Sequence, residues 1–174
     1  MSVSERQTSP PLERARAFEL AGDECVYDSR IEQAKVSYGW AIDAFLDARS
    51  FEEAMRICRK LIRLSPDVVR TRYTLLFLLI GLERYEEARS ELLEYARVVR
   101  ESGTRSFAIP RLQLLAHVTD DPETLQLLES LLSELGAEQL GYSTHLRETG
   151  SPSPSGADRR ERWETLLPIA LRDD

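Results

Sequence analysis

The chain has few of the residues that catalytic and metal sites use. It contains only two histidines, His117 and His145, and no set of nucleophile, base and orienting group can be assembled around either. Glycine-rich phosphate-binding loops and the paired-histidine metalloprotease motif are also missing. Asp120 and Asp121 follow His117 closely, but Asp121 precedes Pro122, a pattern typical of a helix N-terminus rather than of a metal site. We therefore expect no enzymatic activity, no cofactor and no metal.

Cysteines and long apolar runs are equally scarce. Cys25 and Cys58 lie far apart, each within a helical pattern, which predicts two reduced, buried thiols instead of a disulfide framework. The longest apolar run, from Tyr73 to Leu82, is about half of a bilayer span and indicates a buried helix. Residues 1–12 lack the apolar core of a secretory signal. We expect a cytoplasmic protein that does not interact with membranes.

Positive charge is in deficit. The sequence holds 23 Lys and Arg against 30 Asp and Glu, which gives a formal net charge of −7. A field of this sign repels a phosphate backbone, so nucleic acid is not an expected partner.

Apolar residues instead recur at spacings of three and four, and sustained alternation with a period of two is absent. This pattern predicts an all-α protein. Serine followed three residues later by glutamate predicts capping boxes at Ser29 and at Ser50. The predicted helices run from Ser9 to near Tyr27, from Ser29 to about Ala48, from Ser50 to Leu64, from Asp67 to about Ile80, from Tyr85 to about Glu101, from about Ile109 to Val118, and from Asp121 to Leu135.

Composition divides the chain into four segments. We expect a disordered N-terminus over 1–8, a helical array over 9–141, a Ser/Pro/Gly linker over 142–158, and a short amphipathic helix or peptide over 159–174. The last segment carries an apolar face that consists of Trp163, Leu166, Leu167 and Ile169. We expect it to dock at the end of the array, near Leu131 and Leu135.

An internal repeat covers the middle of the chain. A shift of 34 residues places Phe51 on Tyr85, Glu52 on Glu86, Glu53 on Glu87 and Ala54 on Ala88. The small alanines allow two antiparallel helices to approach, and the aromatic residues fill the turn. With this period, residues 35–99 resemble tetratricopeptide repeats. The resemblance implies an α-α superhelix of about three helical hairpins, followed by a flexible C-terminal tail.

In that family the first helix of each hairpin lines a concave groove. The resemblance implies that partner-binding residues are Gly39, Asp43, Arg70, Tyr73 and Phe77, with Gln113 and His117 from the sixth helix. Gly39 and Asp43 stand where chaperone-binding members carry a Lys/Asn carboxylate clamp, which disfavours a chaperone-tail adaptor. Trp163 is a further candidate, as an aromatic anchor in the tail. The alternatives stay open that Tyr73 and Phe77 belong to the core and that the tail helix caps the last hairpin.

These observations predict a scaffold or adaptor that binds a protein or peptide partner through a helical-repeat groove. The alternative is a regulatory sensor domain that binds a small molecule or signalling peptide and controls a transcription or signalling protein. Neither the partner nor the oligomeric state follows from the sequence.

Overall fold

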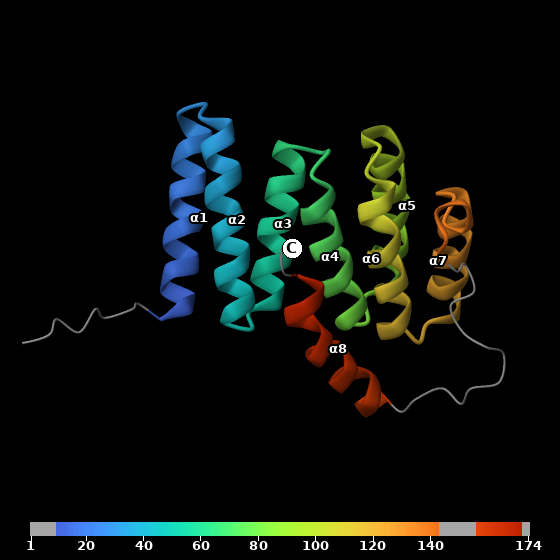
Figure 1. The fold of residues 1–174 in the computed structure, drawn as a ribbon. Helices are drawn as coiled ribbons and strands as arrows, with labels where there is room; N and C mark the ends of the chain where they lie inside the picture. The colour runs from blue at the N-terminus through green and yellow to red at the C-terminus, as the bar shows by residue number, and fades with distance from the viewer. Residues whose placement is uncertain (1–9, 143–155, 172–174) are drawn as a thin grey trace, which may run out of the picture. The chain divides into compact units, whose positions relative to one another are not determined.

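A computed structural model describes residues 10–142 and 156–171 (Figure 1). In this part of the chain the protein is all-α, as the sequence predicts, with eight α-helices and one 3-10 helix. The predicted disordered segment 1–8 and most of the predicted linker lie outside the described residues. The chain divides into two compact units, residues 1–68 and residues 69–174.

The first unit consists of α1 (Pro11–Tyr27), α2 (Ile31–Asp47) and α3 (Phe51–Leu64), with α2 in contact with both other helices. Small residues at the contact let α1 and α2 approach closely, since Ala15, Gly22 and Ala34 are all buried. A Cβ atom added at Gly22 would lie 2.6 Å from the ring of Tyr38. Cys25 and Cys58 are both buried in this unit and are not joined in a disulfide, as predicted.

A cluster of ion pairs joins α1 to α3. Arg56 donates hydrogen bonds of 2.5 and 2.7 Å to the Glu19 carboxylate, and Lys60 donates to both Glu19 and Asp23 at 2.8 Å. The Tyr38 hydroxyl of α2 donates to Asp23 at 2.5 Å. The hydrogen bond from Arg56 is the main reason that the pKa of Glu19 falls to about 2, although burial opposes the shift. The cluster thereby ties all three helices together.

The turns between paired helices differ from the predicted capping boxes. The N-cap residues of α2 and α3 are Arg30 and Ser50, and neither makes a side-chain capping hydrogen bond. Ser29 instead has a left-handed backbone, with φ of 60°. The backbone N–H of Ser29 donates to Val26 O at 3.0 Å and that of Ser50 donates to Phe45 O at 2.8 Å, so the end of the preceding helix satisfies the N–H that the glutamate of each capping box would have bonded. Both predicted capping boxes are wrong for this reason.

We expect Ser29→Gly to stabilise the first unit by about 0.5–1 kcal/mol, because a left-handed backbone costs an L-residue more than it costs glycine. Ser29→Ala keeps that backbone cost and should leave stability nearly unchanged. Urea unfolding of the two variants measures both effects. If Ser29→Ala instead lowered the free energy of unfolding by about 1 kcal/mol, the Ser29 side chain would cap α2 as the capping box requires.

The second unit contains two helical hairpins. The structure places α4 (Val69–Gly81) beside α5 (Tyr85–Ser102) and α6 (Arg105–Val118) beside α7 (Pro122–Glu134); α4 also contacts α6, and α5 contacts α7. Every residue from Thr71 to Ile80 is buried, as the apolar pattern of this helix predicts. Asp121 caps α7 as predicted, since its carboxylate accepts from the backbone N–H of Thr124 at 2.9 Å.

Three boundaries in this unit differ from the predictions. The helix α6 begins at Arg105, a turn earlier than expected, and carries the exposed Pro110 in its interior. A short 3-10 helix, η1 (Glu138–Leu140), follows α7, and α8 (Gly156–Ala170) begins before the predicted boundary at residue 159. None of the described helices is both long enough and apolar enough to cross a membrane.

Candidate functional site

Helix α8 lies against α4 and α6 within the second unit (Figure 1). It runs antiparallel to α4. The carbonyl of Leu171 accepts from Arg70, near the start of α4, at 3.5 Å, whereas Trp163 packs at Gly81, the last residue of α4. We call the surface that receives α8 the docking face. It consists of Arg70, Phe77, Gly81, Glu83, Tyr85, His117 and Asp120.

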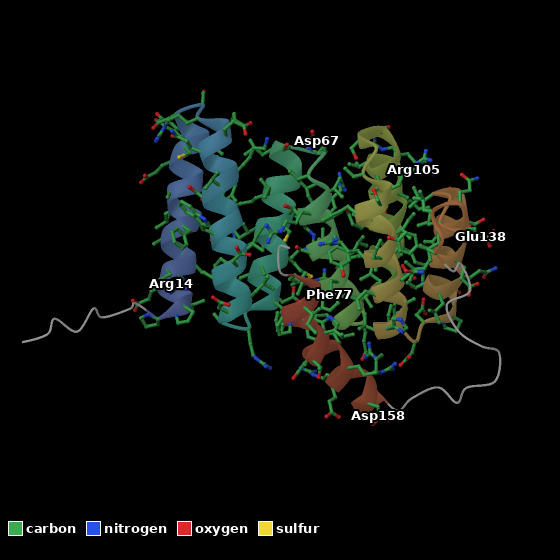
Figure 2. All side chains as sticks on the ribbon, in the orientation of Figure 1. Arg14, Asp67, Phe77, Arg105, Glu138 and Asp158 are labelled. Carbon is green, nitrogen blue, oxygen red and sulfur yellow. The ribbon has the colours of Figure 1, made fainter. Side chains whose placement is uncertain are left out.

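Trp163 anchors α8 to this face. Its side chain is 1% exposed, and its ring stacks on Phe77 with the ring centroids 5.8 Å apart (Figure 2 labels Phe77). The indole N–H donates to the carbonyl of Phe77 at 2.9 Å, which supplies the polar partner that a buried tryptophan needs. Burial of this side chain is the largest apolar contribution that α8 makes to docking.

Glycine at position 81 makes this packing possible. A Cβ atom added there would lie 1.9 Å from one indole atom and 2.4 Å from another. The backbone of Gly81 is not left-handed, so the requirement for glycine comes from the close approach of the ring and not from backbone conformation.

One turn before Trp163, Arg159 fits among polar groups of the docking face. Its side chain is 6% exposed, and it donates to the Tyr85 hydroxyl at 3.0 Å and to the Glu83 carboxylate. Asp120 lies 3.7 Å from the Arg159 Nε atom. Desolvation lowers the pKa of this guanidinium, with Arg162 and Arg160 adding to the effect. Burial of an arginine is tolerated only where such acceptors compensate it.

Arg162 adds a second basic contact to the same end of α8. It donates to the backbone carbonyl of His117 at 3.1 Å and lies 3.6 Å from Asp120. Cations near a helix N-terminus oppose the helix dipole, so the first turns of α8 depend on the carboxylates of the docking face. The helix is also short and contains Pro168. Such a segment is a marginal helix on its own.

The position of α8 corrects the predicted docking site of the tail. Leu131 and Leu135, the expected contacts, are already buried at 2% and 0% exposure, and α8 lies on α4 and α6 instead. The predicted apolar face of the tail is also wrong in part. Trp163 is buried, but Ile169 is 66% exposed.

The predicted site residues are distributed over both units. Arg70, Phe77, His117 and Trp163 come together where α8 docks. Tyr73 is 1% exposed and lies in the core between Phe77 and Tyr95, the alternative that the sequence left open. Gln113 is half-buried on α6. Gly39 and Asp43 belong to α2, in the first unit.

The first unit carries an exposed aromatic pair. Trp40 is 54% exposed, and its ring centroid lies 5.4 Å from that of Phe18. The two side chains border a shallow hollow of about 330 Å³ together with Arg14 and Ala44.

Sequence reasoning missed Gly81, Glu83, Asp120 and Arg159 as components of a site. Gly81 follows the predicted end of a helix at about Ile80, and Asp120 was considered only as a possible metal ligand beside His117. The sequence did contain one indication of this site: Arg159 precedes Trp163 by four residues, and residues four apart share a helix face.

Comparison of the chain with protein-family models, curated proteins and solved structures gives no significant match. The geometry of the docking face is therefore the basis on which function is inferred.

Proposed function

We propose that this protein is a protein-interaction module whose docking face binds a helical peptide. The observation that carries the proposal is that α8 binds the docking face as a helix, with one buried tryptophan and one buried arginine. Its main contact, between Trp163 and Phe77, joins residues that lie 86 positions apart in the sequence. A helix held by an aromatic and an arginine anchor is a recurrent form of peptide recognition. The resemblance of residues 35–99 to tetratricopeptide repeats supports the same proposal.

In this proposal α8 occupies the docking face when no partner is bound. A tethered segment experiences an effective concentration of about 1 mM, so it competes with any free peptide for the same contacts. A partner helix displaces α8 when its own anchors fit at least as well or when its concentration is high.

The test uses the full-length chain with Trp163→Ala, which removes the anchor of α8 and leaves the docking face intact. A labelled peptide of residues 156–171 is titrated with this variant and followed by fluorescence anisotropy. We expect saturable binding to Trp163→Ala. For a peptide with a Kd of about 10 µM, the intact chain should bind about 100-fold more weakly because its own α8 competes.

The matched control adds Gly81→Ala to the Trp163→Ala chain. The new methyl group fills the space that the indole of the peptide requires, so binding should be lost while the helical circular dichroism is retained. Equal binding to the double variant, or no binding to Trp163→Ala, would show that the docking face does not receive peptides.

A further inference from the structure

We infer that the docking face is selective for a helix with an arginine four residues before a tryptophan, and that α8 is the copy of this ligand carried by the chain itself. The inference rests on the proposed function and specifies the partner. Its basis is that the two anchors of α8 contact two separate sets of groups. Trp163 packs on the flat apolar surface at Phe77 and Gly81. Arg159 lies beside the carboxylates of Glu83 and Asp120.

The contacts at Trp163 select tryptophan over other apolar side chains. The Phe77 carbonyl receives an N–H that phenylalanine and leucine do not possess, at 2.9 Å. The ring lies flat on Phe77, at an interplanar angle of 21°, directly over the missing Cβ of Gly81. A phenylalanine would fill less of this surface and leave the hydrogen bond unmade, so it should bind more weakly by about ten-fold or more.

The contacts at Arg159 select a guanidinium over an ammonium. The Tyr85 hydroxyl accepts from Nη1, the Glu83 carboxylate accepts from Nη2, and Asp120 faces Nε, so three acceptors surround one planar group. A lysine offers a single nitrogen that does not reach this spread of acceptors with comparable geometry. The acidic character of Glu83 and Asp120 also opposes an acidic ligand.

The spacing of the two anchors follows from helix geometry. Residues four apart lie about one turn, roughly 6 Å, along the same helix face, so an arginine and a tryptophan at this interval reach both sets of groups together. Arg160 provides an internal comparison. Its side chain is 70% exposed and contacts Glu164 of α8 itself, so it takes no part in recognition.

The experiment compares peptides of residues 156–171 for binding to the full-length Trp163→Ala chain. Relative to the unmodified peptide, we expect Trp163→Phe and Arg159→Lys to bind at least about ten-fold more weakly and Arg159→Ala more weakly still. Arg160→Ala has the same change in charge and should bind within about two-fold of the unmodified peptide, because exposed ion pairs contribute little.

A second comparison assigns the arginine contact to its acceptor. With Glu83→Gln in the Trp163→Ala chain, the penalty of Arg159→Ala in the peptide should shrink, since the two changes remove one interaction. Tight binding of every peptide would overturn the selectivity while leaving the proposed function standing. Failure of the unmodified peptide to bind would overturn both. An equal loss from Arg159→Ala and Arg160→Ala would show attraction by general charge only, and would overturn the anchor spacing.

Discussion

Gly81→Ala is expected to expel Trp163 from the docking face although it adds a single methyl group. The added Cβ would lie 1.9–2.4 Å from three indole atoms, far inside van der Waals contact. The ring has no room to shift, because it stacks on Phe77 and donates to the carbonyl of that residue. Loss of a buried tryptophan contact typically costs about 3–5 kcal/mol, which exceeds the gain of about 1 kcal/mol from alanine in a helix.

Tryptophan fluorescence measures this release directly. In a Trp40→Phe background the remaining signal comes from Trp163, whose emission should be blue-shifted in the parent and shifted towards that of the unfolded chain in Gly81→Ala. Gly39→Ala is the matched control, because a Cβ at Gly39 meets no atom within 4 Å. Gly39→Ala should leave the emission unchanged and raise stability by up to about 1 kcal/mol. A blue-shifted emission in Gly81→Ala would mean that Trp163 packs elsewhere.

The elements were predictable where local chemistry determines them. The period of the apolar residues indicates the helices, Asp121 before Pro122 indicates the start of α7, and Gly103 indicates the end of α5 with φ of 69°. The turns after α1 and α2 were not predictable in the same way. A serine followed three residues later by glutamate is compatible with a capping box, but the backbone of Ser29 closes the preceding helix instead.

The docking face was only partly predictable, because it depends on contacts between distant segments. The identity of Trp163 as an anchor could be read from its apolar surroundings, and Phe77 from the repeat. The contact between Trp163 and Phe77 could not be predicted from the sequence. No local pattern indicates that Leu131 and Leu135 are already buried, or that α4 and α6 are fully covered only when α8 is docked. The need for glycine at position 81 appears only once the indole is in place.

The core of the second unit contains two phenols whose removal should stabilise the protein. The hydroxyls of Tyr73 and Tyr95 are buried and have no hydrogen-bond partner among the described residues, and their ring centroids lie 6.5 Å apart. A buried polar group without a partner costs about 1–3 kcal/mol. Tyr95→Phe removes this hydroxyl and keeps the packing of the ring, so we expect the free energy of unfolding to rise by a similar amount.

The matched control is Tyr85→Phe, the same chemical change at a hydroxyl that accepts from Arg159 at 3.0 Å. This variant should lower stability, because the buried guanidinium loses an acceptor. Urea unfolding at neutral pH compares the two variants. A loss of stability in Tyr95→Phe would show that its hydroxyl has a partner after all.

Alkaline pH gives a second signature of the same phenols. Burial raises the pKa of both Tyr73 and Tyr95 above the value of about 10 found in an unfolded chain. These phenols leave stability independent of pH below about pH 10, and stability falls as pH rises further, because the unfolded chain then releases protons that the folded chain retains. The stability of the parent should therefore fall between about pH 10 and pH 11, and that of Tyr95→Phe should fall less steeply because one of the two phenols is gone. Equal slopes in the two proteins would show that Tyr95 ionises in the folded chain as readily as in the unfolded one.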